Sequence, residues 1–275
     1  APKQGLSWAF QILPYMEQNA IHNITTQQQL ASTPVNMYFC PSRRPPTFNP
    51  NLGRWLMDYA ALVGAPTPGQ PDAMRWAFPR TNTANYDQAM RNGELCLGEA
   101  MWGGTRHHLN GDASEVFDPS KGGRLPIFPT QGVIVRSSYF VKDGTGASGN
   151  PQVTNLRLPG MTKFKNITDG TSNTIVLCEK RVDITRLDGP HTDDDAGWSD
   201  GWDFDTLRLA SCKPSSDSSK PDGPEVIVAG SSHPSVFICG FADASMHALS
   251  YDIDLVMLNR MANKSDGETV DRSGF

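Results

Sequence analysis

The chain has 275 residues, 38% of them hydrophobic, and a formal net charge of −5. That length is enough to bury a stable core, and the absence of a basic stripe argues against nucleic acid as a partner. No apolar run reaches the roughly 18 residues that would span a bilayer, so the sequence predicts no transmembrane segment. The 25 glycines and 21 prolines favour many turns and long loops.

The N-terminal half is predicted to begin with a helical region. Residues 6–24 carry apolar side chains three or four positions apart, which favours a helix that is kinked or divided at Pro14. We therefore assign residues 1–30 as helical. The prolines of residues 32–50 favour extended or turn conformations, because each one disfavours helix in the residue before it. Residues 31–130 are accordingly predicted to be a loop-rich insertion.

Residues 131–262 are predicted to form the sheet. Strand-like runs occur at 133–141 and at 174–179. The clearest pattern is at 236–251, where apolar residues alternate on both sides of a polar break centred on Asp243, as is typical of a β-hairpin. In its first strand, alternate residues are expected to face the core: Phe237, Cys239 and Phe241.

The end of the chain is predicted to be a short capped helix and a tail. Asp252 or Asp254 is expected to cap a helix at 255–261, because aspartate accepts hydrogen bonds from the first helical amides. Residues 263–275 are expected to be a frayed tail. The predicted elements make one globular domain over residues 1–275 and an α+β fold.

The five cysteines are ambiguous. None of them forms a C-x-x-C pair, which argues against zinc or iron–sulfur ligation by these thiols. Cys178 and Cys239 follow or interrupt apolar runs and are predicted to be small buried residues. The sequence leaves open whether one or two disulfides form among the others: Cys40, Cys96 and Cys212.

An acidic segment lies between residues 188 and 205. Carboxylates this dense in a glycine-broken loop repel one another unless they are solvated, paired with cations or bridged by an ion such as Ca²⁺. One hypothesis is a calcium site, and the alternative is a solvated loop that pairs with Arg186 or Arg208. The interleaved Trp198 and Trp202 suggest that the loop folds back onto the core. The candidate calcium ligands are Asp193, Asp194, Asp195, Asp200 and Asp203.

His233 admits two interpretations. It could be a metal ligand or a general base, or a positioned histidine that satisfies turn backbone groups and links the start of the strand to Asp243. We favour the second, because no nucleophile or second ligand stands at a diagnostic spacing from it. The sequence also lacks the G-x-S-x-G, H-E-x-x-H and phosphate-binding glycine patterns of common enzyme classes.

Several blocks then occur in a fixed order along residues 6–260. They are SW with ILPYMEQ, FCPSRR, DYA at Asp58, ITDGTSNT followed by Glu179, GW with DGWD around Trp198 and Trp202, and a histidine nine residues ahead of Asp243. Together they resemble a large planctomycete family of prepilin-like proteins of unassigned function, in which a C-terminal His-x9-Asp-Gly motif recurs.

The resemblance implies a pilin-like fold, in which an N-terminal helix packs on an antiparallel sheet and long loops carry insertions. It also implies an extracellular, cell-surface or periplasmic location. The apolar N-terminal helix of that family is absent from this sequence, so we expect the globular part. The structural residues that it implies are His233, Asp243, Asp169, Gly170, Asn173, Glu179, Trp198 and Trp202. The glycine of the motif is Ala244 here, and alanine with a positive φ would cost on the order of 1 kcal/mol.

Three functions are compared. The first is a non-catalytic structural subunit of an extracellular filament or surface assembly, whose partners are copies of itself, other surface proteins or polysaccharide. The second is a calcium-dependent carbohydrate-binding protein, suggested by the acidic segment with its tryptophans. The third is a hydrolase that uses His233 and an aspartate as acid and base. No cofactor other than Ca²⁺ is suggested.

Overall fold

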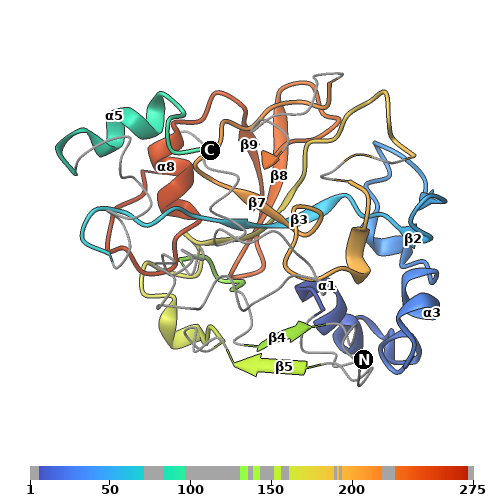
Figure 1. The fold of residues 1–275 in the computed structure, drawn as a ribbon. Coiled ribbons are helices and arrows are strands. Elements are labelled where there is room, and N and C mark those ends of the chain that lie inside the picture. The colour runs from blue at the N-terminus through green and yellow to red at the C-terminus, as the bar shows by residue number, and fades with distance from the viewer. Residues whose placement is uncertain are drawn as a thin grey trace, which may run out of the picture.

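A computed structural model describes residues 6–70, 83–96, 131–135, 139–142, 152–155, 161–188, 191, 194–218 and 227–271. The fold is a mixed α/β arrangement around a five-stranded sheet with the strand order β7-β3-β6-β8-β9 (Figure 1). β7 runs parallel to β3, whereas the other neighbouring pairs are antiparallel. The strands of this sheet are β3 (Tyr59–Val63), β6 (Ile175–Glu179), β7 (Leu207–Leu209), β8 (Val236–Phe241) and β9 (Met246–Ser250).

The two faces of β8 are buried to different depths, whereas β7 and most of β3 are buried on both faces. Along β8, residues alternate between half-buried and buried, and the buried ones contribute to the main apolar core, as predicted. Helices α5 (Tyr86–Arg91) and α8 (Leu255–Met261) supply further side chains to that core and lie side by side (Figure 1). Because side chains alternate along a strand, the opposite face of β6 and β8 carries Glu179 and Ile238.

In place of the predicted N-terminal helix, the described residues up to Ala31 form four short helices. Pro14 stands in the first turn of the second, and Glu17 ends it with a left-handed φ of 61°. These helices surround a second apolar cluster that includes Phe10, Leu13 and Trp198. The pilin-like arrangement of one N-terminal helix on an antiparallel sheet is therefore not found in the described residues. The helices are α1 (Trp8–Gln11), η2 (Leu13–Met16), α2 (Asn19–His22) and α3 (Gln27–Ala31).

Two further predictions need correction. Residues 31–130 were predicted to be a loop-rich insertion, yet they supply β3, which lies between β6 and β7. The strand predicted over 133–141 is confirmed only in its second half: residues 133 and 134 form bends, and β4 (Tyr139–Lys142) pairs with β5 (Gln152–Asn155) in a separate two-stranded sheet. The remaining short elements are η3 (Asn36–Tyr38), β1 (Phe48–Asn49), β2 (Arg54–Trp55), η4 (Thr83–Asn85), η6 (Phe164–Asn166) and η7 (Gly197–Ser199).

The C-terminal helix begins where the sequence predicts. Asp254 is the N-cap of α8, and its Oδ1 accepts hydrogen bonds from the amides of Val256 at 2.7 Å and Met257 at 3.3 Å. Among the described residues, no helix is both long and apolar enough to cross a membrane.

One disulfide joins Cys96, which follows α5, to Cys212, which follows β7. This pairing was left open by the sequence. Cys178 and Cys239 are free and buried, as predicted, and Cys40 is also free and buried. The bridge joins two residues that are 116 positions apart in the sequence.

The hairpin turn places an alanine in a left-handed conformation. The Ala244 amide donates to the Phe241 carbonyl at 3.0 Å, and the Phe241 amide donates to Ser245 at 2.9 Å. This is a tight turn followed by one left-handed residue, which is a common three-residue hairpin connection. Ala244 has a φ of 68°, so alanine occupies the left-handed position that the glycine of the motif would take.

Replacing Ala244 with glycine is expected to raise the free energy of unfolding by about 0.5–1 kcal/mol. The relief of the left-handed strain exceeds the extra backbone entropy that glycine gains in the unfolded chain. Ala242→Gly, in the same turn but without a positive φ, is expected to lower stability instead. Urea unfolding followed by circular dichroism measures both, and equal changes in the two variants would contradict the prediction.

Candidate functional site

Charged residues from several sequence blocks meet where β3 begins and β6 ends. Asp58 stands just before β3, and Lys180 stands just after β6. Because these strands are antiparallel, the two residues lie together. The Lys180 amide donates to the Asp58 carbonyl at 3.0 Å. The FCPSRR block lies against these strand ends. We call the resulting set the ionic cluster, and it consists of Arg43, Arg44, Asp58, Lys180, Asp194, Asp205 and Asp217.

Arg44 makes the closest contacts in the ionic cluster. Its Nη1 and Nη2 donate to the two oxygens of Asp194 at 2.6 and 2.9 Å, and its Nη2 lies 2.7 Å from Asp58 Oδ1. A two-pronged guanidinium–carboxylate contact of this kind is strong and fixes the orientation of both groups. Lys180 Nζ adds a contact of 2.9 Å to the same Asp194.

Arg43 extends the ionic cluster to the far side of Asp58. Its Nε donates to Asp217 Oδ2 at 2.8 Å, and its Nη1 lies 3.4 Å from Asp58 Oδ1. Asp217 Oδ1 in turn accepts from the Val182 amide at 2.9 Å. Lys180 Nζ lies 3.5 Å from Asp205 Oδ1, which completes three cations and four carboxylates.

The paired side chains are buried, so each charge depends on its partner. The side chains of the pairs that Arg44 and Lys180 form with Asp58, Asp194 and Asp205 are at most 3% exposed. Burial alone would raise the pKa of Asp194, but Arg44 and Lys180 outweigh it and hold that pKa well below its ordinary value. Burial would likewise lower the pKa of Arg44, and Asp194 with Asp58 raises it instead. Asp194 and Arg44 therefore both stay charged at neutral pH.

The acidic segment is mostly buried between residues 194 and 205, which corrects the picture of a solvated loop for that part. Trp198 is fully buried, and Trp202 packs against the main core, so the prediction that the segment folds back is confirmed. Gly197 makes this packing fit, because it has a φ of 65° and a Cβ there would lie 2.0 Å from the Trp55 carbonyl oxygen. The carboxylates of this segment pair with Arg44, Lys180 and Arg54. The predicted Arg208 donates to the Phe204 carbonyl of the same segment.

The predicted calcium ligands separate into two groups. Asp194 is held by Arg44 and Lys180, so it belongs to the ionic cluster and its assignment to a calcium site is corrected. Asp193 lies outside the described residues, and Asp195 is half-buried, with its carbonyl accepting from Asn49 at 2.9 Å. Asp200 and Asp203 lie instead with a residue that the prediction left out, Asp205.

These three residues form what we call the aspartate cluster: Asp200, Asp203 and Asp205. All three are buried, and one carboxylate oxygen of each lies within 4.8 Å of the others. Arg54 approaches Asp200 at 3.5 Å, and Lys180 approaches Asp205 at the same distance. The arrangement offers hard oxygen donors of the type that calcium prefers.

A second group combines three different donor types. Cys40 and Glu179 are buried and His233 is half-buried, and the sulfur, a carboxylate oxygen and a ring nitrogen lie within 4.8 Å of one another. We call it the thiol–carboxylate–imidazole cluster. His233 Nε2 lies 3.7 Å from Glu179 Oε1, so its nearest carboxylate is a glutamate and not the aspartate of the hydrolase hypothesis. Cys40 was not predicted as a site residue, although it lies in the FCPSRR block.

His233 and Asp243 do not brace one corner. They lie beyond opposite ends of β8, whose six residues span about 20 Å. The amide of His233 donates to Ser231 Oγ at 3.0 Å, and its carbonyl accepts from Tyr251 at 3.0 Å. Asp243 Oδ1 accepts from the amide and hydroxyl of Ser245 within the hairpin turn. The predicted link between the two residues is therefore wrong.

The ITDGTSNT block forms a turn that joins the hairpin to the end of the chain. Asp169 accepts from the amides of Asp266 at 2.7 Å and Gly267 at 3.1 Å. Asn173 Nδ2 donates to the Asp169 carbonyl at 3.1 Å, and Gly170 has a φ of 98°. The amide of Ala242 also donates to the Thr174 carbonyl at 2.9 Å. These contacts hold part of the tail that the sequence predicted to be frayed.

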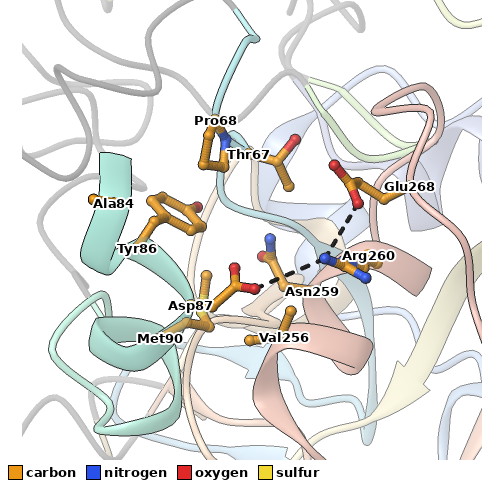
Figure 2. A pocket seen from close by; sticks show the side chains of 10 residues that line it. All are labelled: Thr67, Pro68, Ala84, Tyr86, Asp87, Met90, Val256, Asn259, Arg260 and Glu268. Carbon is orange, nitrogen blue, oxygen red and sulfur yellow. Dashed lines mark ion pairs between the residues drawn. The ribbon is translucent and has the colours of Figure 1, made fainter. Parts of the chain in front are cut away.

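A pocket of about 270 Å³ lies elsewhere, between α5 and α8 (Figure 2). Arg260 points between Asp87 and Glu268, with ion-pair distances of 3.9 and 3.2 Å. Neither the ionic cluster nor the thiol–carboxylate–imidazole cluster contributes to its lining. That lining consists of Thr67, Pro68, Ala84, Tyr86, Asp87, Met90, Val256, Asn259, Arg260 and Glu268.

Comparison with known proteins gives one match. A family model, SBP_bac_10, described as "Protein of unknown function (DUF1559)", matches residues 1–256. No curated protein and no solved structure matches the chain.

Replacing Asp194 with asparagine is expected to lower the free energy of unfolding by about 3–5 kcal/mol, because Arg44 and Lys180 would stay buried beside a neutral amide. The wild-type protein has the full contribution of Asp194 above about pH 4 and loses it as the pH falls below that, toward the depressed pKa of the folded state. The variant should lack this part of the acid dependence. Urea unfolding at several pH values measures both effects.

Asp87→Asn is the matched control for this prediction. Asp87 contacts Arg260 at 3.9 Å, and its side chain is 49% exposed. Exposed ion pairs contribute little, so the change should stay within about 0.5 kcal/mol. A loss in Asp194→Asn no larger than that in the control would show that the ionic cluster does not stabilise the fold.

Proposed function

The chain belongs to the family described as "Protein of unknown function (DUF1559)", and we propose that it acts as a non-catalytic structural subunit of an extracellular or cell-surface assembly. The ionic cluster carries this proposal. The charged residues of the FCPSRR, DYA and acidic blocks pair with one another inside the protein, as expected of residues that hold a fold together.

The disulfide supports an extracytoplasmic location. Disulfides form and persist in oxidising compartments and are rare in the cytosol. The Cys96–Cys212 bridge closes a long loop, and in the chain-entropy model a loop of about 100 residues gains about 4.7 kcal/mol from such a bridge. A protein outside the cell, without chaperones to refold it, benefits from that constraint.

The first quarter of the chain exposes side chains that could make subunit contacts. Tyr15, in the ILPYMEQ block, is 90% exposed, whereas its neighbour Leu13 is fully buried. Met37 and Leu52, which also lie in the first quarter of the chain, are 56% and 50% exposed. Exposed aromatic and long apolar side chains are enriched where proteins contact one another. We therefore place the subunit contact on this part of the chain, with Tyr15 as an anchor.

Purified protein is expected to form oligomers or filaments on concentration, as followed by sedimentation velocity and negative-stain electron microscopy. Tyr15→Ser should raise the concentration at half-assembly about tenfold or more, because a buried aromatic anchor contributes about 1.4 kcal/mol or more to an interface. Phe164→Ser, at a 77% exposed position outside the N-terminal quarter, is the control and should leave assembly unchanged. Wild-type protein that stays monomeric at every concentration would refute the proposal.

The aspartate cluster favours a second candidate function, a calcium-dependent carbohydrate-binding surface protein. Three buried carboxylates with oxygens within 4.8 Å of one another provide part of a calcium shell, and the glycine-broken loop around them can supply backbone carbonyls. Trp202 is half-buried beside this loop and offers a ring of the kind that stacks on sugars.

If Ca²⁺ binds the aspartate cluster, chelation should lower the melting temperature by about 5–10 °C, since saturation at 100 times Kd stabilises a protein by about 2.7 kcal/mol. Asp203→Asn should remove the response to calcium, whereas Asp252→Asn, at an exposed position, should keep it. Glycan-array binding measured with and without calcium tests the carbohydrate part. No change in either measurement on chelation would exclude this candidate.

A further inference from the structure

The thiol–carboxylate–imidazole cluster joins three segments that are far apart in the sequence. Cys40 follows η3, Glu179 is the last residue of β6, and His233 stands shortly before β8. Their donor atoms lie within 4.8 Å of one another. Neither the ionic cluster nor the proposed assembly surface gives these three side chains a role.

We propose that Cys40, Glu179 and His233 together bind one divalent transition-metal ion of the zinc class. Thiolate sulfur, imidazole nitrogen and carboxylate oxygen are the three protein donors of zinc sites, and sulfur with nitrogen disfavours calcium and magnesium. Donors around a tetrahedral zinc ion lie about 3.3–3.8 Å apart, given bond lengths of about 2.0–2.3 Å. Because the three atoms lie within 4.8 Å of one another, no pair has to close by more than about 1.5 Å.

The ligands are already held by contacts outside the site. Glu179 Oε2 accepts from the Ile238 amide at 2.9 Å, which orients the carboxylate so that Oε1 is the atom facing His233. The Cys40 amide donates to Asp58 Oδ2 at 2.8 Å, so the ionic cluster positions the thiol. Outer contacts of this kind orient metal ligands and raise affinity.

Charge balance fits a divalent ion. The buried Glu179 carboxylate accepts from the Ile238 amide at 2.9 Å and lies 3.7 Å from the His233 ring. Thiolate, carboxylate, neutral imidazole and one divalent ion sum to zero, so the complex buries no net charge. The Cys40 proton passes to the solvent as the metal–sulfur bond forms.

The side chain of His233 is 32% exposed, so the ion can enter from that side. A fourth coordination position remains there for water or another donor.

The test uses the purified chain, stripped with a chelator and titrated with Zn²⁺ or Co²⁺. Wild-type protein should bind one ion per chain with a submicromolar Kd, measured by calorimetry or by competition with a chromophoric chelator. Bound Co²⁺ should show a thiolate-to-cobalt charge-transfer band in the near ultraviolet. His233→Gln and Cys40→Ser should each weaken binding by about 100-fold or more, and Cys40→Ser should also abolish the band.

The controls separate this site from the rest of the chain. His247→Gln and Cys178→Ala remove a histidine and a buried thiol outside the cluster and should bind Zn²⁺ as the wild type does. Asp203→Asn, in the aspartate cluster, should also keep zinc binding. If Cys40→Ser fails to fold, His233→Gln decides, because its side chain is partly exposed and the circular dichroism spectrum reports its fold. Wild-type protein without stoichiometric binding, or a folded His233→Gln that binds equally well, would overturn the proposal.

Discussion

The bidentate contact between Arg44 and Asp194 is the interaction on which the rest of the arrangement depends. It joins the acidic segment to the FCPSRR block. Through Asp58 and Lys180 it also joins that block to the ends of β3 and β6. Buried ion pairs add little net stability over an apolar packing, but they penalise every alternative in which one partner is lost. The ionic cluster therefore mainly determines which loops pack together. It adds less to the stability of that packing.

The sequence blocks turn out to be partners of one another. Ser7 and Trp8 of the first block donate to carbonyls of Trp198 and Thr206, in and beside the GW and DGWD block. The ITDGTSNT turn contacts the hairpin turn at Ala242, and Glu179 meets Cys40. Blocks that are individually short thus make a consistent set of contacts across the fold, which supports a structural role for most of them.

The sequence predicted local features well and the distant pairings poorly. The hairpin and the Asp254 cap follow from alternation and from a single capping side chain, and both are read within a few residues. The burial of Lys180 and Arg44 contradicts the usual exposure of charged side chains, and it becomes favourable only through carboxylates far along the chain. β3 was missed because the short apolar run Tyr59–Val63 lies among prolines and glycines, and its neighbours in the sheet are remote in sequence. Cys40 was missed because its candidate co-ligands are a glutamate and a histidine, with no paired cysteine nearby.

The position of β3 between β6 and β7 has a consequence for how the protein is made. Its hydrogen-bonding partners on both sides come from the second half of the chain, and the contacts around it join residues 150 and 174 positions apart. Closing such long loops costs entropy before any contact repays it, so proteins rich in distant contacts fold slowly. A nascent chain cannot complete its central sheet until nearly all of it has left the ribosome. During that interval Arg43 and Arg44 stay hydrated, because the carboxylates of Asp217 and Asp194 that pair with them have not yet been made.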